Sequence, residues 1–260
     1  MSLAWSNGRL LPAEEVRIDP LDAGFLAGDG LFETLRVDAG KAGDVEAHLD
    51  RLLQALPRIG IEIPESRQDL FAAVTAVAAA AAPTARLRIT VTRSIGGIAG
   101  IAAEPTRLIL TAPYEPPSPE HYRQGVAVVL LDEPWIDSRS PLAGLKSLSY
   151  QANRLALRRA EALGAFEALL VNERGRLVEG SRSNVILALR DGLFTPPLTD
   201  GCLPGTVRRR LLEAGKVGER SLGLDDLAAA SEILLTNSLI GVLRANLKTE
   251  QPAGAKAPTG

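Results

Sequence analysis

A proline-rich break near the middle of the chain most constrains how it can fold. Four prolines fall within the seven residues Pro113 to Pro119. Proline lacks a backbone N–H and has a fixed φ, so this segment favours extended, poorly packed backbone. We therefore predict an N-terminal α/β domain at 1–112, a linker at 113–123 and a C-terminal α/β domain at 124–260. The tail 251–260 is expected to be disordered.

Hydrophobic periodicity indicates a mixture of strands and helices before the break. Within Arg86–Arg93, the apolar residues Leu87, Ile89 and Val91 alternate with polar ones, which is typical of a half-buried strand. The predicted strands are Ala4–Leu10, Leu31–Val37, Arg86–Arg93 and Arg107–Ala112, and the predicted helices are Glu46–Ile59 and Gln68–Ala82. No internal repeat is apparent.

The second half has the same mixed character. Its predicted strands are Val126–Leu131, Ala168–Val171, Val185–Ala188, Leu193–Thr195 and, as the final strand, Glu232–Thr236. Its predicted helices are Tyr150–Leu163 and one that begins near Gly205. With 46% hydrophobic residues, 260 residues are enough to bury one large core or two medium ones.

Charge and composition argue against several classes of protein. The 29 basic and 31 acidic residues are spread along the chain without a basic block, so nucleic acid is not an expected partner. The apolar run Leu70–Ala82 is shorter than the roughly 20 residues that a bilayer span needs. A single cysteine, Cys202, and an N-terminus without a secretory pattern favour a cytoplasmic protein.

No metal site is expected from the two histidines. His48 and His121 lie far apart, and neither has cysteines or clustered carboxylates at ligand spacing. His48 is better interpreted as part of the helix packing or as a partner of Arg51.

Lys146 is the first candidate for chemistry. It lies in PLAGLKSLSY, where Leu142, Leu145 and Leu148 are expected to desolvate it in part. Desolvation lowers the pKa of a lysine and favours Schiff-base formation. A surface lysine with its charge in solvent is the ordinary alternative.

Glu179 opens a second candidate segment. This carboxylate is followed by Gly180 and by small polar side chains, including Ser183 and Asn184. Such a segment can approach a flat anionic ligand closely. A carboxylate can also keep a pyridine nitrogen protonated, although an ordinary turn carboxylate fits the pattern as well.

Two further segments could bind a phosphate. Gly205 and Thr206 precede a helix whose first N–H groups could meet an anion, or could form a plain helix cap. Arg51 lies off the leucine stripe of its helix, where it could bind a phosphate or be solvated.

The order of these motifs resembles a known family. GDGLFETLRV with HLDRL, then LAGLKSLSY, then EALLVNERGRLVEGSRSNVIL, then TPPLTDGCLPGTVR resemble the class IV aminotransferases, which are fold type IV enzymes that use pyridoxal 5'-phosphate (PLP). The resemblance implies a two-lobed α/β fold with PLP in the interdomain cleft. It also implies a small-molecule substrate and a homodimer.

The resemblance assigns roles to individual residues. Lys146 is expected to carry PLP as a Schiff base and to act as the catalytic base, Glu179 to meet the pyridine nitrogen and Arg51 to bind the phosphate. Further cofactor contacts are expected from Tyr150, Ser183, Asn184, Gly205, Thr206, Val207 and Asn237, and substrate contacts from Phe32 and Ser238. The spacing from Lys146 to Tyr150 is one residue shorter than in the branched-chain enzymes.

Several reactions remain open within this family. PLAGLK, TNSLIGV and SIGG resemble segments of 4-amino-4-deoxychorismate lyases, although Ile98, Ala99 and Gly100 replace the RGY of their loop. The arginine and histidine pair of the D-amino-acid enzymes is also missing. We predict a lyase that gives 4-aminobenzoate and pyruvate, with an aminotransferase of branched-chain or D-amino acids, or a non-catalytic PLP-binding module, as alternatives.

Overall fold

The computed structural model describes residues 2–94 and 104–248, which form two compact units. Unit 1 comprises Met1–Pro116, Gly144–Tyr150 and Ser238–Ile240, and unit 2 comprises Pro117–Ala143, Gln151–Asn237 and Gly241–Gly260. The mixed α/β fold class is confirmed. The predicted domain ranges stay a prediction, and the units differ from them because Gly144–Tyr150 and Ser238–Ile240 belong to unit 1. Ile98, Ala99, Gly100 and the tail 251–260 lie outside the described residues.

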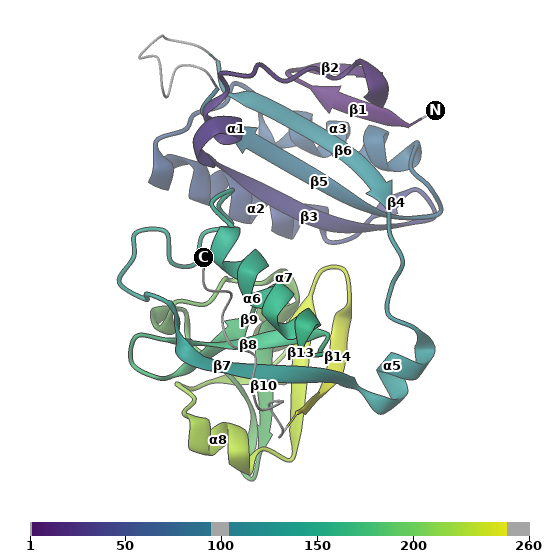
Figure 1. The fold of residues 1–260 in the computed structure, drawn as a ribbon. Coiled ribbons are helices and arrows are strands. Elements are labelled where there is room, and N and C mark those ends of the chain that lie inside the picture. The colour runs from purple at the N-terminus through teal and green to yellow at the C-terminus, as the bar shows by residue number, and fades with distance from the viewer. Residues whose placement is uncertain (1, 95–103, 249–260) are drawn as a thin grey trace. The chain divides into compact units, whose positions relative to one another are not determined.

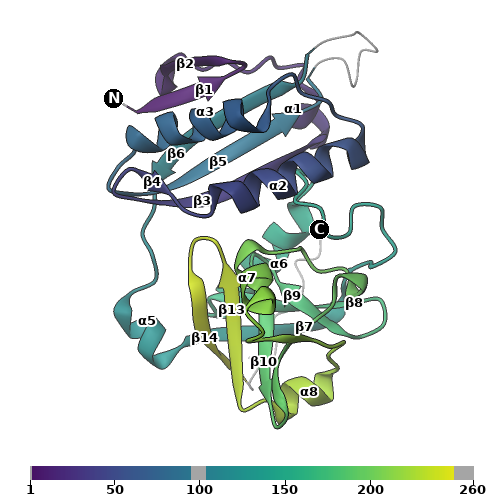
Figure 2. The ribbon, with the colours of Figure 1, turned by 180° about the vertical axis from the view of Figure 1, so that it is seen from behind.

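Unit 1 is an antiparallel sheet with helices on one face. Its strands, in the order β2-β1-β6-β5-β3-β4, are β1 (Leu3–Ser6), β2 (Arg9–Pro12), β3 (Gly30–Asp38), β4 (Lys41–Ala42), β5 (Thr84–Thr92) and β6 (Thr106–Pro113). The helices are α1 (Ala23–Ala27), α2 (Val45–Ala55) and α3 (Arg67–Ala79), with short 3-10 turns η1 (Ala13–Glu15) and η2 (Leu56–Ile59). Figure 2 shows α2 and α3 across one face of the sheet.

Periodicity explains the core of this unit. Leu87, Ile89 and Val91 of β5 are buried, and Leu49 and Leu52 of α2 belong to the same cluster. The predicted strands over β3, β5 and β6 and the predicted helices over α2 and α3 are confirmed. Within residues 2–94 and 104–248, no helix is long and apolar enough to cross a membrane.

The predicted strand Ala4–Leu10 is wrong, because the chain turns back within it. Asn7 and Gly8 have φ values of 47° and 86° and connect β1 to β2 as a hairpin. Two consecutive positive φ values define the tight turn for which Asn-Gly is the preferred sequence. The Asn-Gly dipeptide was the sequence signal for this turn.

Unit 2 contains a second sheet, in the order β12-β11-β10-β13-β14-β7-β8-β9. Its strands are β7 (Val126–Ile136), β8 (Glu167–Asn172), β9 (Leu177–Gly180), β10 (Asn184–Leu189), β11 (Gly192–Thr195), β12 (Gly218–Glu219), β13 (Glu232–Asn237) and β14 (Gly241–Leu247). Its helices are α5 (Pro119–Gln124), α6 (Gln151–Ala162), α7 (Thr206–Glu213), α8 (Leu224–Ala229) and the 3-10 turn η3 (Leu198–Asp200). Strand β9 also pairs with β10, so the hydrogen-bonded order β10-β13-β14-β7-β8-β9 returns to β10 and forms a closed ring. These strands are labelled in Figure 1.

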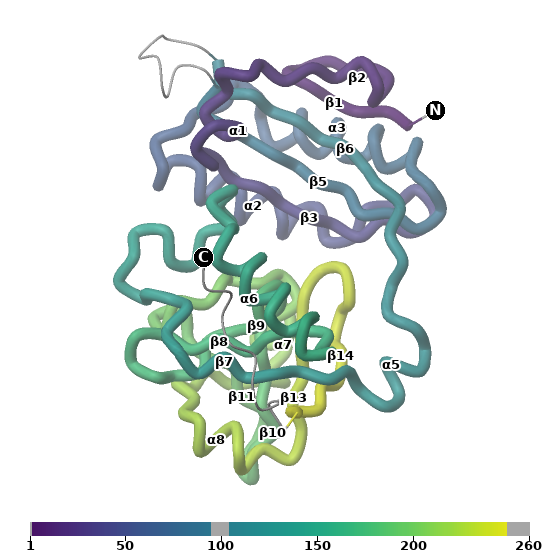
Figure 3. The backbone as a smooth tube through the Cα atoms, in the orientation of Figure 1, coloured from purple at the N-terminus to yellow at the C-terminus, as the bar shows by residue number. Residues whose placement is uncertain are grey.

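Two predictions in this half are corrected. Glu232–Thr236 is not the final strand, because β14 follows, with Leu243 and Ala245 buried at alternate positions. The linker 113–123 is not extended throughout, because α5 begins at Pro119. Ser118 caps that helix and proline is favoured in the first turn. The path through α5 into β7 can be followed in Figure 3.

Candidate active site

The Lys146 segment lies along the start of β3. The Phe32 N–H donates to the Lys146 carbonyl at 2.9 Å, and the Leu148 N–H donates to the Gly30 carbonyl at 2.9 Å. A Cβ at Gly30 would lie 2.3 Å from the Val91 carbonyl oxygen and 2.8 Å from Leu148 Cδ1, so only glycine fits there. The GDG motif therefore provides the space in which the Lys146 segment joins unit 1.

Aromatic rings surround the Lys146 amine. Its Nζ lies 4.4 Å from the Phe32 ring centroid and 5.5 Å from that of Tyr150. The two rings meet edge to face at 5.4 Å. Of the leucines that were expected to desolvate the amine, Leu145 packs against the core of unit 1, and Leu142 is 45% exposed.

A second cation lies at the same ring. The Arg88 guanidinium carbon is 3.8 Å from the Phe32 centroid, and Arg88 Nε donates to the Thr90 hydroxyl at 3.2 Å. Ser238, the other predicted substrate residue, donates its hydroxyl to the Thr34 carbonyl at 2.6 Å. Phe32, Ser238 and Lys146 thus gather around β3, together with Arg88.

Arg51 is held by a buried carboxylate of unit 1. Its Nε and Nη2 donate to the two Glu33 oxygens at 2.7 and 2.6 Å. His48 Nδ1 lies 2.7 Å from Glu33 Oε2. Burial alone would raise the pKa of Glu33, but the charge and hydrogen bonds of Arg51, with His48, lower it to about 2. Glu33 is therefore an ion inside the core.

Glu179, Asn184 and Gly205 come together in unit 2. Glu179 and Asn184 are register partners in β9 and β10. Glu179 Oε2 accepts from the Leu203 N–H at 2.9 Å and from Asn184 Nδ2 at 3.4 Å, and Asn184 also donates to the Leu203 carbonyl at 2.8 Å. These bonds attach the segment before α7 to the glutamate.

The start of α7 offers donors without a side-chain cap. Its N-cap is Gly205, which has no side chain to accept from the N–H groups of the first turn. Thr206 and Val207, the first residues of the helix, are both buried. The Thr236 hydroxyl, in the strand beside Asn184, is buried without a partner among the described residues.

The hydroxyl of Ser183, a predicted cofactor residue, is bonded to a buried carboxyl group of unit 2. It donates to Glu167 Oε2 at 3.1 Å, and Ser181 also donates to Glu167. Burial raises the pKa of Glu167, against the hydrogen bonds from the serines. Asn237 donates its amide to the Arg182 carbonyl at 3.1 Å. The carboxylate of Glu167 thus shapes the turn between β9 and β10.

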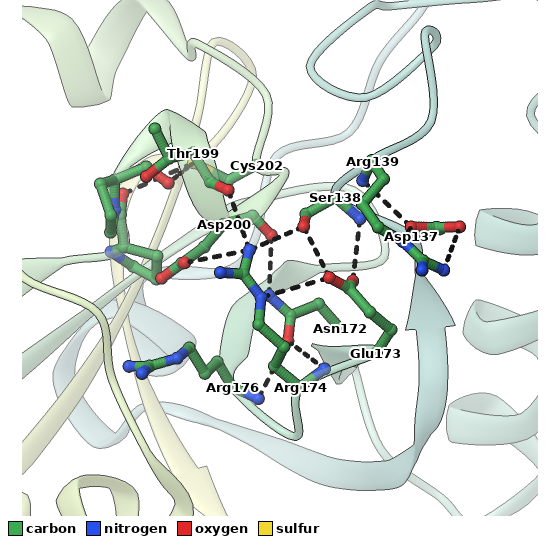
Figure 4. A network of polar contacts seen from close by, with 12 residues as sticks. Asp137, Ser138, Arg139, Asn172, Glu173, Arg174, Arg176, Thr199, Asp200 and Cys202 are labelled. Carbon is green, nitrogen blue, oxygen red and sulfur yellow. Dashed lines mark hydrogen bonds and ion pairs between the residues drawn. The ribbon is translucent and has the colours of Figure 1, made fainter.

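A polar network holds the chain just before Gly205 (Figure 4). Asn172 Nδ2 donates to the Asp200 carbonyl at 3.0 Å, and Arg174 Nη2 donates to the Thr199 carbonyl at 3.2 Å. Glu173 accepts from the Ser138 N–H at 2.9 Å and from its hydroxyl at 2.8 Å. The turn after β8 therefore anchors η3.

Three residues of these clusters were missed by the sequence predictions. Arg88 was assigned only to the polar face of a strand. Glu33 and Glu167 could have been found in the sequence, because each is a charged residue at a position expected in the core. Glu33 lies in a series of alternate positions of β3 that is otherwise apolar. Glu167 begins the apolar run of β8. Among the described residues, no group of three or more His, Cys, Asp and Glu side chains could hold a metal ion.

Comparison with known proteins identifies the family. The family model for class IV aminotransferases matches residues 30–247. The chain belongs to the class IV aminotransferase family. The crystal structure of 4-amino-4-deoxychorismate lyase from Pseudomonas aeruginosa is 32% identical, with a TM-score of 0.82 over 97% of this chain and 94% of that one.

Two other members of this family are also similar. A bifunctional aminodeoxychorismate lyase and D-amino acid transaminase from Mycobacterium tuberculosis is 31% identical, over 84% of this chain and 81% of its own length. A hypothetical aminotransferase from the same organism, in its PLP-bound form, is 28% identical with a TM-score of 0.83, over 95% of this chain and 91% of that one. The chain is therefore an enzyme of this family, either a lyase or an aminotransferase, and its cofactor is PLP.

Each unit contains groups that suit a part of PLP. Unit 1 supplies an amine beside aromatic rings and a fixed guanidinium. Unit 2 supplies a carboxylate and the start of a helix. Gly205 leaves a space at this helix start that a side chain would fill, because a Cβ there would lie 1.9 Å from Asn184 Oδ1. These donor types suit an aldehyde, a phosphate and a pyridine nitrogen.

Proposed function

We propose that this protein is a PLP-dependent 4-amino-4-deoxychorismate lyase that gives 4-aminobenzoate and pyruvate, in folate precursor synthesis. The observation that carries the proposal is the set of side chains near Lys146. Phe32, Tyr150 and Arg88 are suited to bind a substrate with a flat ring and a carboxylate. The choice of reaction is supported by the 32% identity to the Pseudomonas lyase over nearly the whole of both chains.

In this proposal the residues divide the work. PLP, when bound, supplies an electron sink conjugated to the substrate amine. Lys146 takes the proton from the carbon that bears the amine, and the C–O bond to the enolpyruvyl group breaks. The released enolpyruvate takes up a proton to become pyruvate, and the ring becomes aromatic. Arg88 holds the substrate carboxylate, and Phe32 and Ser238 lie on the substrate side.

The cofactor contacts complete the proposal. Glu179 meets the pyridine nitrogen, and Arg51 meets the phosphate together with the helix start at Gly205, Thr206 and Val207. Tyr150, Ser183, Asn184 and Asn237 are the remaining cofactor contacts that the family resemblance assigns. The Ser183 hydroxyl already donates to Glu167, so its contact would come from its backbone. We further propose a cytoplasmic homodimer.

An aminotransferase of D-amino or branched-chain amino acids is the second candidate. It is supported by the bifunctional relative from M. tuberculosis, whose name includes D-amino acid transaminase activity. The same amine would serve both reactions, since Lys146 would return the proton to the cofactor rather than complete an elimination.

Two assays separate these candidates. The PLP-loaded protein is given aminodeoxychorismate while pyruvate and 4-aminobenzoate are followed. In parallel it is given D-alanine or branched-chain amino acids with 2-oxoglutarate while glutamate is followed. Equimolar pyruvate and 4-aminobenzoate without glutamate supports the lyase, glutamate alone supports the aminotransferase, and neither product supports a non-catalytic module.

The covalent assignment has its own test. Protein incubated with PLP and reduced with borohydride should carry one phosphopyridoxyl group, which a peptide map places on Lys146. The K146A variant should lack it while keeping its thermal stability. A group found on Lys41 or Lys216 in place of Lys146 would reject the assignment.

A further inference from the structure

The side chains of Glu33, His48 and Arg51 form a buried trio in unit 1. Glu33 comes from β3, whereas His48 and Arg51 lie one turn apart on α2. We infer that Glu33, held in place by His48, is a positioning residue that orients the Arg51 guanidinium for the phosphate of PLP. This inference rests on the role proposed above for Arg51 as a phosphate ligand.

The contacts fix the plane of the guanidinium. Glu33 pairs with Arg51 through Nε and Nη2, so both carboxylate oxygens are used on one edge of the group. A two-point contact of this kind sets the direction as well as the distance of the charge. Arginine has five N–H donors in a rigid fork, so fixing Nε and Nη2 on Glu33 also fixes the direction in which the remaining N–H groups point.

The carboxylate is itself buried and bonded to a second residue. Both Glu33 and His48 side chains are only 1% exposed. Because an ionised carboxylate only accepts hydrogen bonds, His48 Nδ1 must carry the proton that points at Glu33 Oε2, 2.7 Å away. Residues three apart on a helix share a face, so α2 presents both His48 and Arg51 to the same strand.

A purely compensating charge would behave in the opposite way. A carboxylate that only neutralises Arg51 competes with a phosphate for it, so its removal would strengthen phosphate binding. A carboxylate that orients Arg51 lowers the entropy that the side chain loses when a phosphate binds. Removal of such a carboxylate would therefore weaken phosphate binding. The sign of the change therefore distinguishes positioning from neutralisation.

The experiment compares PLP with pyridoxal, which lacks the phosphate. Dissociation constants for both are measured with the full-length chain by absorbance titration, and borohydride trapping gives the adduct yield as a second readout. We expect E33Q to lower the preference for PLP over pyridoxal about tenfold, as loss of one charged contact would. Pyridoxal affinity should stay unchanged.

E65Q is the matched control. Glu65 also holds an arginine of unit 1 at two points, since Arg107 Nε and Nη2 donate to it at 3.0 and 2.8 Å. This pair is likewise almost buried, at 4% and 9% exposure. E65Q should lower the thermal stability as E33Q does, while its preference for PLP stays that of the wild type.

Each outcome decides the question. An E33Q variant with unchanged or increased preference for PLP overturns the positioning role. R51M tests the underlying assignment: if it keeps the wild-type preference while Lys146 is still trapped, the phosphate role of Arg51 fails instead. If E33Q does not fold, E33D retains the buried charge but is one methylene shorter, and a wild-type preference in E33D overturns the inference.

Discussion

Replacing Gly205 by alanine should disrupt the cluster of Glu179, Asn184 and Gly205 in unit 2 through steric overlap alone. Gly205 has φ −64° and ψ 142°, which alanine also adopts, so the backbone is not strained. The added Cβ would lie 1.9 Å from Asn184 Oδ1, whereas ordinary contact begins at 3.4 Å. Either the amide of Asn184 or the start of α7 must move by about 1.5 Å.

The cost of that movement can be worked from the contacts. Overpacking a close contact costs about 1–3 kcal/mol. A displaced Asn184 also loses its bonds to the Leu203 carbonyl and to Glu179, which adds about 1–2 kcal/mol. Replacing a glycine N-cap by alanine costs about 0.5–1 kcal/mol by itself. We expect G205A to lower the free energy of unfolding by about 2.5–6 kcal/mol.

G223A isolates the steric part. Gly223 is the N-cap of α8, also in unit 2, and a Cβ there would meet only ordinary contacts, the nearest at 3.7 Å. It should cost only about 0.5–1 kcal/mol, the capping preference alone. Urea unfolding of both variants, followed by circular dichroism, gives the comparison. Equal stability of G205A and G223A would refute the reasoning.

Three further predictions concern single side chains. E179Q should retain PLP but lower kcat about 100-fold, since an amide does not keep the pyridine nitrogen protonated; undiminished steady-state turnover would contradict this. R88M should raise KM for a carboxylate substrate with little change in PLP affinity, and a defect confined to PLP affinity would count against it. Burial raises the pKa of Glu167 above its ordinary 4.5, so the Glu167 carboxyl binds a proton more tightly in the folded than in the unfolded protein. The stability that this protonation contributes is lost as the pH rises. E167Q should therefore gain stability relative to the wild type as the pH rises above 4.5 in urea unfolding, and parallel pH profiles of the two proteins would contradict a raised pKa.

Local pattern was enough to predict most elements of both units. The alternation in β5 and the leucine stripe of α2 are properties of a few neighbouring residues, so they are visible in the sequence. The hairpin at Asn7 and Gly8 was missed because apolar residues on both sides of a two-residue turn imitate one strand. Strand β14 was missed although its buried residues, Leu243 and Ala245, stand at alternate positions.

The sequence alone determined the family, the cofactor and the residue types of the candidate site, because these follow from the identity and order of motifs. Only the tertiary structure decided that the Lys146 segment pairs with β3, that Arg88 stacks on Phe32, and that Glu33 clamps Arg51. Those contacts join residues distant along the chain, and local periodicity carries no information about which edges and faces meet. The role of a buried carboxylate depends on such a contact, because its charge is tolerated in a core only beside a partner that the fold brings to it.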